Sequence, residues 1–419
     1  MNRNRQQMSS KLLYDTIHGY IELDEICLRI IDTPEFQRLR YIRQLGACHF
    51  VFPTATHTRF EHSIGVANLS KEMMESIRHN NPELNISDET IENVQIAGLC
   101  HDLGHGPFSH LFDNSLLTGV KSSNAEHEER SCQLLEYLIE KNQIALSKER
   151  LEIIQELIHP KNRHQLNIPD YIYQIVCNLF NSIDVDKFDY LKRDAYMLGL
   201  SYSFDYTRII KQARVISNQI CFPEKIAPSI YQIFITRWRL HTEIYTHPIV
   251  RAIEWMITDC LKIANQTLGL VDSIDDMSKF YQINDNILDI IEFIDKPELM
   301  EAKTLLNRIK KRDLYDYIGE IKLKKPLEIG LDKLNISNLD LDNEDIILDM
   351  VKIGYQSDPV ANVKFYDLKD SKKSFVLDGN TKSNLIPQDF QDNILRIYCR
   401  NRSKIEIVKQ LYNTLKSHI

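Results

Sequence analysis

The chain has 419 residues, of which 43% are hydrophobic and 26% are charged, so wholesale disorder is excluded. Glycine and proline number only 13 each, which excludes collagen-like and propeller architectures, and the many Leu, Ile, Lys, Glu and Gln residues favour helices. A net charge of −8 argues against a protein that coats nucleic acid without specificity.

The amino terminus is polar. Its first stretch, MNRNRQQMSSK, lacks the apolar segment of a signal peptide, and the chain contains no run of roughly 18 apolar residues that would span a membrane. The eight cysteines form no CxxC pair, which predicts reduced, mostly buried thiols and disfavours a cysteine zinc site. We therefore expect an intracellular protein, cytoplasmic or nuclear, that is neither secreted nor bound to a membrane.

Helical periodicity dominates the chain after this tail. Between residues 11 and 319, apolar side chains recur every three or four positions. The Asp-Thr-Pro sequence at 32–34 predicts the start of a basic helix over 35–45, and Ser87 predicts the cap of a helix that reaches His101. The other expected elements here are helices over 181–200 and 231–263 and a polar loop over 118–128.

The pattern changes after Gly319. Residues 321–344 are largely polar and predict a boundary. The elements expected beyond it are strands over 346–355 and 360–366 around a turn at 356–359, a third strand over 374–377 and a helix over 388–398. We expect a mostly α protein with a polar tail over 1–10, an all-helical core domain over 11–320, and a small α+β lobe over 321–419 suited to regulation or oligomerisation.

Histidine and aspartate residues in the helical region have the spacing of a metal site. His62 is followed 39 residues later by the pair His101 and Asp102, and Asp186 comes 84 residues after that pair. Neutral imidazole and carboxylate suit a divalent transition metal, and a site with an open position acidifies bound water for hydrolysis. A lone histidine is more often a hydrogen-bonded core or surface residue, but the four-part pattern favours metal ligands.

With these motifs the sequence resembles the HD-domain phosphohydrolase superfamily, and within it the deoxynucleoside triphosphate triphosphohydrolases that carry a sterile-alpha-motif domain. The stretches that carry the resemblance are 15–19, 30–42, 59–63, 96–110 and 183–190. It continues to about residue 400, which is nearly the whole chain. Only about ten residues precede the shared part, so we expect the sterile-alpha-motif domain and its functions to be absent.

The resemblance implies a tightly bound metal and a set of cations for the phosphates. The metal ligands that it implies are those that the spacing indicates: His62, His101, Asp102 and Asp186. This ligand set does not discriminate among iron, manganese and zinc, and the superfamily's usual choice implies iron or manganese. It also implies Mg²⁺ with the nucleotide phosphates. Arg59, Lys187 and Arg237 match positions that hold the triphosphate, and arginine forks suit phosphate oxygens.

The reaction implied is attack on the α-phosphorus, with release of the deoxynucleoside and intact triphosphate. The leaving 5′ oxygen needs a proton, which a positioned histidine can supply. The resemblance places His105, His110 and His127 by the phosphates. His110 and Asp113 are three residues apart, so on a helix the carboxylate can orient the imidazole. We expect His110 to be the general acid with Asp113 in support, and His127 is the rival acid.

Sugar recognition would separate such an enzyme from a general phosphatase. Asp186, Tyr190 and Asp194 are spaced four residues apart and form one helix stripe. The resemblance makes Tyr190 and Asp194 contacts to phosphate and the 3′ hydroxyl. The other positions matched to the sugar pocket are Gln44, Leu45 and Tyr245. A packed Leu and Tyr leave no room for a 2′ hydroxyl. Thr246 replaces the family's usual glutamine near the base, so no base preference is implied.

The resemblance also implies regulation, because the related enzyme forms a tetramer when guanine and deoxynucleotide activators bind between subunits. The residues matched to the GTP or dGTP site are Lys11, Asp32, Gln37, Arg40 and Arg312. The residues matched to the second, dNTP site are Asp205, Arg208, Lys225 and His247. The positions that differ are Tyr14, Ser229, Pro248 and Asp316. Two lost cations and one added carboxylate weaken phosphate binding, so we expect a homo-oligomer, dimer to tetramer, that needs more activator.

Two other functions are compatible with the sequence. Another HD hydrolase, such as a nucleotide monophosphatase or a cyclic-nucleotide phosphodiesterase, would use the same metal ligands, although the three additional histidines and the sugar-pocket match argue against it. A non-catalytic binder of single-stranded nucleic acid is a secondary alternative. The basic side chains available to it are Arg38, Arg40, Arg43, Lys310, Lys311, Arg312, Arg396, Arg400 and Arg402.

Overall fold

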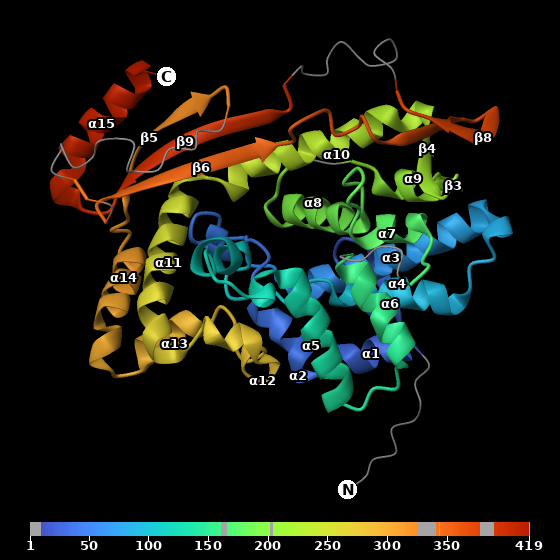
Figure 1. Cartoon of the computed structure of the whole chain (residues 1–419), viewed down its shortest axis with the longest axis horizontal. Coiled ribbons are helices and arrows are strands. Elements are labelled where there is room, and N and C mark those ends of the chain that lie inside the picture. Colours follow the sequence, from blue (N-terminus) through green and yellow to red (C-terminus); the bar gives the residue numbers. More distant parts are fainter. Residues whose placement is uncertain are drawn as a thin grey trace, which may run out of the picture. The chain divides into compact units, whose positions relative to one another are not determined.

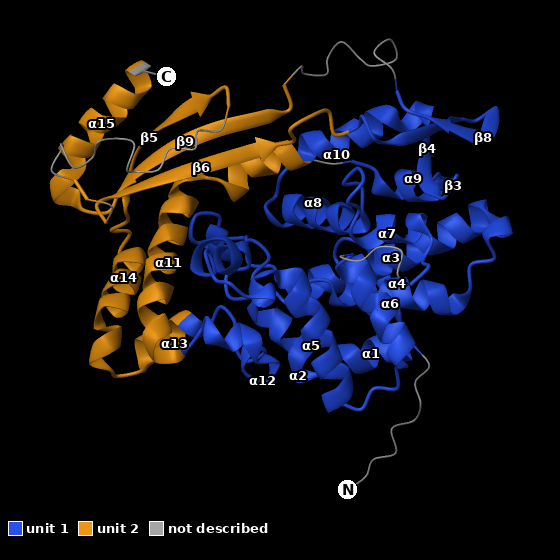
Figure 2. Cartoon of the chain, viewed as in Figure 1, with its two compact units in different colours: residues 1–236, 269–287, 360–382 blue, residues 237–268, 288–359, 383–419 orange. Residues whose placement is uncertain are grey.

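The computed structural model describes residues 10–160, 166–201, 204–325, 341–342, 344–377 and 389–418 (Figure 1). The expected tail over 1–10 therefore lies almost wholly outside the described residues, as does most of the expected boundary over 321–344. The chain forms two compact units (Figure 2). Unit 1 comprises residues 1–236, 269–287 and 360–382, and unit 2 comprises 237–268, 288–359 and 383–419.

Helices form the centre of unit 1. They are α3 (Arg59–Asn80), α4 (Asp88–Cys100), α5 (His127–Lys141), α6 (Lys148–Ile158), α7 (Asp170–Val176) and α8 (Val185–Met197). Helices α3 and α4 pack closely, and α3 also contacts α8. Fully buried aliphatic side chains such as Val66, Leu69, Val94 and Ile96 fill the space between them. The predicted mostly α fold is confirmed.

Local capping decides where three of these helices begin. The Thr58 side chain and Glu61 form a capping box at the start of α3. Ser87 accepts a hydrogen bond from the Thr90 backbone N–H and starts α4, as predicted. Asp184 accepts from the Lys187 N–H and starts α8. As a result His62 falls in the first turn of α3, His101 directly follows α4, and Asp186 is the second residue of α8.

The amino-terminal part of unit 1 contains elements that the sequence did not predict. Strands β1 (Ser10–Asp15) and β2 (Gly19–Asp24) form an antiparallel hairpin, which α1 (Glu25–Ile31) follows. The predicted helix over 35–45 is wrong beyond Tyr41. Thr33 caps α2 (Pro34–Gln37), a 3₁₀ turn follows at Arg38–Tyr41, and Ile42 is extended. The chain turns there because the Arg59 N–H donates to the Ile42 carbonyl and pairs residues 42–44 with 57–59.

The remaining elements of unit 1 are short. They are 3₁₀ turns at Gly46–Phe50, Pro82–Leu84, Ser123–Ala125, Glu224–Ile226 and Asp272–Asp275, a π-helical turn at Phe112–Leu116, helices α9 (Tyr206–Lys211) and α12 (Met277–Phe280), and strands β3 (Arg214–Ile216), β4 (Gln219–Pro223), β7 (Lys364–Asp367) and β8 (Asp370–Phe375). The four strands form a sheet in the order β3-β4-β7-β8, in which β4 and β7 are parallel. The expected polar loop over 118–128 ends where α5 begins at His127.

Unit 2 combines helices with a three-stranded antiparallel sheet. Its helices are α11 (Pro248–Leu268), α13 (Ile287–Phe293, of which the first residue belongs to unit 1), α14 (Met300–Lys310) and α15 (Ile405–His418). Its strands are β5 (Asp316–Leu323), β6 (Ile346–Gly354) and β9 (Gln391–Cys399). It also contains a π-helical turn at His241–Tyr245 and 3₁₀ turns at Pro297–Leu299 and Arg402–Lys404. The strand order is β5-β9-β6. Val408 and Leu411 of α15 join the buried cluster on this sheet.

Two predictions about this region are wrong. The continuous helix expected over 231–263 is broken, because α10 (Ala227–Leu240) and α11 are separate and Pro248 disfavours a helical residue before it. Residues 391–398 of the helix expected over 388–398 instead belong to β9, the central strand, residues 389 and 390 are irregular, and residue 388 lies outside the described residues. Seven consecutive residues of β9 are buried, and such an apolar run does not distinguish a strand from a buried helix by its periodicity.

The other strand predictions are partly confirmed. The strand over 346–355 corresponds to β6. Only residues 364–366 of the strand expected over 360–366 belong to β7, and only residues 374 and 375 of the third belong to β8. Strands β6 and β7 do not form a hairpin, because β6 pairs with β9 whereas β7 pairs with β4 and β8.

The cysteines and the helix lengths agree with the composition. All eight cysteines are free thiols, and all but the partly exposed Cys177 are buried, so the predicted buried thiols are confirmed. Among the described residues, no helix combines the length and the apolar character needed to cross a membrane.

Candidate metal centre and adjoining histidine cluster

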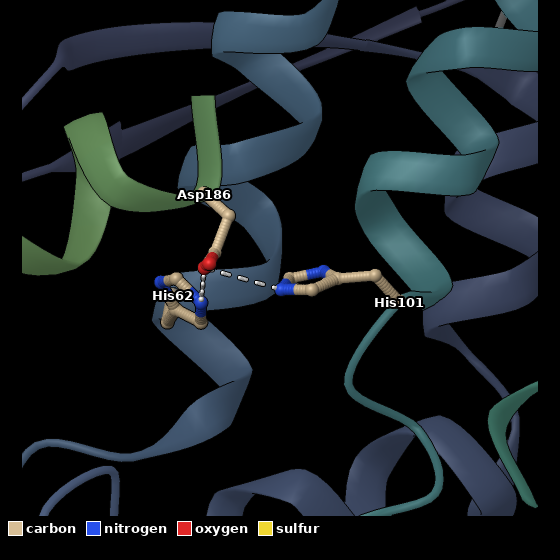
Figure 3. A group of neighbouring side chains, drawn as sticks. All are labelled: His62, His101 and Asp186. Atoms are coloured by element: carbon tan, nitrogen blue, oxygen red, sulfur yellow. Dashed lines mark ion pairs between the residues drawn. The ribbon is translucent and has the colours of Figure 1, made fainter. Parts of the chain in front are cut away.

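The four predicted metal ligands meet inside unit 1, although they come from α3, the turn after α4, and α8. His62 Nε2 lies 3.1 Å from Asp186 Oδ1 and 3.4 Å from Asp102 Oδ2. His101 Nε2 lies 3.5 Å from Asp186 Oδ1 and 3.4 Å from Asp102 Oδ1. Figure 3 shows His62, His101 and Asp186 converging on one point. Two imidazole nitrogens and two carboxylates therefore face one another at distances that a metal ion can bridge.

The protonation pattern of the two imidazoles fits metal binding. His62 Nδ1 lies 2.7 Å from Asp189 Oδ2, and His101 Nδ1 lies 2.8 Å from the Gly98 carbonyl. Both acceptors require the proton on Nδ1, which leaves the Nε2 lone pair available as a ligand. Both Nε2 atoms are buried and make no hydrogen bond in the described structure. A buried polar atom without a hydrogen bond is costly, so this donor set fits a divalent cation.

Carboxylates dominate the electrostatics of this ligand group. Burial alone would lower the pKa of His62, but the nearby carboxylates of Asp186 and Asp189 outweigh it and raise the pKa to about 10. Burial would raise the pKa of Asp186, yet the neighbouring imidazoles of His101 and His62 hold it below the ordinary value. The group therefore attracts positive charge, whether it is carried by protons or by a metal ion.

A second cluster of imidazoles adjoins the first. The rings of His105 and His127 stack with centroids 4.1 Å apart, and His110 lies 5.2 Å from His105 and 5.9 Å from His127. His105 Nε2 lies 3.3 Å from Asp102 Oδ1, so Asp102 contacts both clusters. His110 is exposed, whereas His105 is buried. An exposed imidazole beside a metal group is in a suitable position for proton transfer to a bound substrate.

Asp113 contacts this second cluster from the π-helical turn. Its Oδ2 lies 3.3 Å from His127 Nδ1 and 3.9 Å from His105 Nδ1, and its Oδ1 accepts a hydrogen bond from Arg130. Asp113 and His110 also have potential ligand atoms within 4.8 Å of each other. The carboxylate is thus shared among the three histidines, and Arg130, which is fully buried, fixes its orientation.

Desolvation and neighbouring positive charge both disfavour protonation of the second cluster. Desolvation by the surrounding protein, followed by the charges of Arg59 and His127, lowers the pKa of both His105 and His110. Arg59 donates through Nη1 to Asp102 Oδ2 and through Nε to Ser109 Oγ at 2.8 Å. The guanidinium of Arg59 beside neutral imidazoles suits an anionic substrate.

Other predicted substrate residues lie in the same unit. Lys187 Nζ, in the first turn of α8, lies 3.0 Å from Asp184 Oδ2. Tyr190 and Asp194 follow on the same helix, and Asp194 Oδ1 pairs with His57 Nε2 at 2.7 Å. The Gln44 N–H donates to the His57 carbonyl, so the turn that carries Gln44 and Leu45 adjoins the residues that contact Asp194.

Comparison with known proteins agrees with this geometry. Residues 59–194 match the HD domain, and residues 204–353 match the HD associated region. The chain is 39% identical over 421 residues to the deoxynucleoside triphosphate triphosphohydrolase SAMHD1 homolog of Dictyostelium discoideum, which covers 98% of this chain and 81% of the relative. It is 36% identical to SAMHD1 of Gallus gallus and of Bos taurus, covering 97% and 94% of this chain and 74% and 76% of those proteins.

The chain belongs to the SAMHD1 family of HD-domain enzymes.

Several positions that match other SAMHD1-family sites belong to unit 2. Arg237 is in α10 and stacks on Tyr355, with 5.2 Å from its guanidinium carbon to the ring centroid. Tyr245 ends the π-helical turn, where its ring lies 4.9 Å from that of His241. The other predicted residues in unit 2 are His247, which precedes α11, and Arg312, which follows α14. These four residues are therefore outside the unit that holds the two imidazole clusters.

The other residues predicted from the sequence to bind activators lie in unit 1. Lys11 is exposed on β1, Asp32 ends α1, and Asp205 caps α9. Gln37 donates to the Ile31 carbonyl and accepts from Arg40, whose guanidinium carbon lies 3.5 Å from the Phe60 ring centroid. The other two predicted residues, Arg208 and Lys225, are exposed. Gln37 and Arg40 thus have local structural contacts as well.

One buried network behind the ligands was not predicted. Asp189 accepts from His62 and, through both oxygens, from Arg193 at 2.9 Å, and its Oδ1 lies 2.6 Å from His18 Nε2. Arg193 also donates to Asp15 at 2.9 Å. The network thus links His62 to the turn of the β1-β2 hairpin. The spacing of Asp186, Asp189 and Arg193 on one helix face is the sequence signal that could have revealed it.

Proposed function

We propose that this chain hydrolyses deoxynucleoside triphosphates to the deoxynucleoside and inorganic triphosphate. The observation that carries the proposal is the pairing of a complete four-donor metal group with a three-histidine cluster beside Arg59, and the two share Asp102. The SAMHD1 relatives named above are deoxynucleoside triphosphate triphosphohydrolases, and their similarity supports the same reaction here.

The proposed residue roles follow from charge and contact. His62, His101, Asp102 and Asp186 would hold iron, manganese or zinc, and Mg²⁺ would accompany the substrate phosphates. A divalent cation supplies positive charge beside the α-phosphate and lowers the pKa of water. Arg59 and Lys187 would bind phosphate oxygens. Lys187 now contacts Asp184 and would exchange that contact for phosphate.

His110 would protonate the leaving 5′ oxygen. Desolvation, followed by the positive charge of Arg59, lowers the pKa of His110 in the free protein, and a bound triphosphate would offset that charge and increase the affinity of the ring for a proton. Asp113 and Arg130 would hold His127 and His105 in place around it. Water would form the new P–O bond at the α-phosphorus as the bond to the 5′ oxygen breaks. One proton of this water would pass to solvent, and the proton from His110 would neutralise the alkoxide.

A product assay tests the reaction. Purified full-length protein, loaded separately with iron, manganese or zinc, should convert dATP to deoxyadenosine and intact triphosphate, both resolved by anion-exchange chromatography. Release of orthophosphate or pyrophosphate would instead indicate another HD phosphatase. Metal analysis of the untreated protein in the same experiment identifies the resident ion.

We also propose that Leu45 excludes ribose from the sugar pocket, where Gln44, Tyr190 and Asp194 would contact the deoxynucleotide. Leu45→Ala should lower the ratio of dATP to ATP turnover by about tenfold, because it opens space at the 2′ position. Leu179→Ala, which removes an exposed side chain elsewhere in unit 1, is the matched control. Equal rates on ATP and dATP in the parent protein would refute this account.

We further propose that guanine nucleotides and dNTPs activate the protein by promoting a homo-oligomer. The residues of unit 1 that match activator-binding positions of the family favour retained activation. Asp316, which pairs with Arg402 at 3.4 Å, adds negative charge four residues after Arg312 and should weaken phosphate binding. Light scattering and dATP turnover should both rise with GTP, at higher concentrations than the family norm. Asp32→Ala should abolish the response to GTP. Unchanged mass and rate at millimolar GTP would show that this control is absent or that assembly is constitutive.

A further inference from the structure

The loop that carries two of the three clustered histidines has an unusual backbone. It runs from Leu103 to His110, between α4 and the π-helical turn. Phe108 and Ser109 both adopt left-handed conformations, with φ of 60° and 56°. Side-chain-bearing residues disfavour this region, so two in succession require support from the surrounding structure. They lie between His105 and His110, so their conformation sets the separation of these two rings.

The carboxylate of Asp285 supplies that support. Its Oδ1 accepts a hydrogen bond from the Phe108 N–H at 2.7 Å, and its Oδ2 accepts one from the Arg43 N–H at 2.9 Å. Ser109 Oγ donates in turn to the Arg43 carbonyl at 3.1 Å. One buried side chain thus connects the histidine loop to the turn that presents Gln44 and Leu45.

A buried arginine anchors the same segment from the other side. Arg38 donates to the carbonyls of Leu103 at 2.8 Å and His105 at 2.6 Å, and also to the carbonyl of Ile283 at 3.2 and 3.0 Å. Its guanidinium carbon lies 4.7 Å from the Phe280 ring centroid. Residues 280–285 therefore support the histidine loop, residues 103–110, at both ends. Arg38 connects them to the loop near His105, and Asp285 connects them to it near His110.

Burial of Asp285 is unfavourable by itself. It raises the pKa of this carboxyl to about 6, although the Phe108 and Arg43 hydrogen bonds and the charges of Arg43 and Arg59 oppose the shift. Arg43 Nη1, at 3.7 Å, is a cationic group close to it, and Arg38 adds further positive charge. A neutral side chain would avoid the desolvation penalty but would not accept both backbone N–H groups.

We propose that Asp285 is a positioning residue that fixes His110 relative to the Gln44–Leu45 turn by binding the Phe108 and Arg43 amides with one carboxylate. The inference deepens the proposed triphosphohydrolase function and rests on it. Asp285 acts through the backbone of the loop, at a distance from the reacting atoms. Loss of its carboxylate should therefore reduce turnover without emptying the metal site.

The test compares Asp285→Asn with Asp276→Asn in the full-length, metal-loaded protein. Asparagine keeps the shape but can accept only one of the two N–H groups through its side-chain oxygen. We expect kcat for dATP to fall at least about tenfold, because small misplacements of reacting groups are costly, with KM and bound metal nearly unchanged. Asp276 caps α12, and asparagine caps equally well, so the control should match the parent protein.

Amide hydrogen exchange gives an independent readout. In the parent protein the Phe108 and Arg43 amides should exchange slowly, and Asp285→Asn should accelerate exchange across residues 103–112 but not in α3. Fast exchange of these amides in the parent protein, or parental kcat and exchange in the variant, would overturn the proposal. So would a loss of kcat that merely follows lost metal or lost folded protein. A parent protein with no hydrolase activity would contradict the proposed function. The exchange data would still show whether Asp285 stabilises the loop over 103–110.

Discussion

Two groups of histidines share one site but have opposite electrostatics. His62 and His101 are surrounded by carboxylates, and the pKa of each is raised even though burial opposes it. His105 and His110 lie near Arg59 and His127, and their pKa values are lowered. The difference follows from which charged side chains surround rings of the same chemical type. The first group is suited to hold a cation, and the second is suited to receive an anion.

Arg59 and Asp102 form the boundary between the groups. Asp102 contacts His62, His101 and His105, while Arg59 pairs with Asp102 and donates to Ser109 in the histidine loop. Burial would raise the pKa of Asp102, but Arg59 and the neighbouring imidazoles hold it well below its ordinary value. A carboxylate that stays ionised can be a metal ligand while its arginine partner faces the phosphates.

The largest effect is expected when two of the four candidate metal ligands are removed. The double variant His101→Ala and Asp102→Ala should lose its tightly bound metal and all measurable dATP hydrolysis, because two of four ligands are gone. Metal analysis by mass spectrometry and the triphosphate assay measure the two effects. His79→Ala, an exposed position at the end of α3, is the control. Stoichiometric metal with full turnover in the double variant would mean that the site is wrongly placed.

The second group is tested by separating turnover from binding. His110→Ala should lower kcat by about a hundredfold or more while nucleotide affinity and metal content stay close to those of the parent protein, which is typical for loss of a general acid. The same measurements on His127→Ala rank the two candidates. A large loss for His127→Ala with little for His110→Ala would transfer the proton-donor role to His127, the ring that lies 3.3 Å from Asp113.

A smaller effect is expected when the carboxylate that orients the ligand His62 is neutralised. Asp189→Asn removes a charge that holds His62 in its ligand tautomer, and it should weaken metal affinity about 10- to 100-fold. Competition with a chelator measures this without reference to activity. Asp88→Asn, which changes an exposed carboxylate at the start of α4, is the matched control. Parental metal affinity in Asp189→Asn would show that the network supports the fold but not the ligand.

Local sequence was sufficient for the starts of α2 and α4. The cap residues Thr33 and Ser87 were correctly predicted to start α2 and α4, because a cap depends on side chains within three or four positions of the backbone groups that they satisfy. The helix expected over 388–398 failed for the complementary reason. Its residues form the central strand β9, and the pairing with β5 and β6 that decides this is remote in sequence.

The sequence by itself determined the mostly α fold, the family and the identity of the four candidate ligands, because these depend on periodicity, capping and motif spacing. Only the tertiary structure decided which groups surround them. The partners that orient His62 and the histidine loop, Asp189 and Asp285, are 127 and 177 residues away from the groups that they contact. Such contacts depend on burial and on the geometry of packed elements, and no local pattern encodes them.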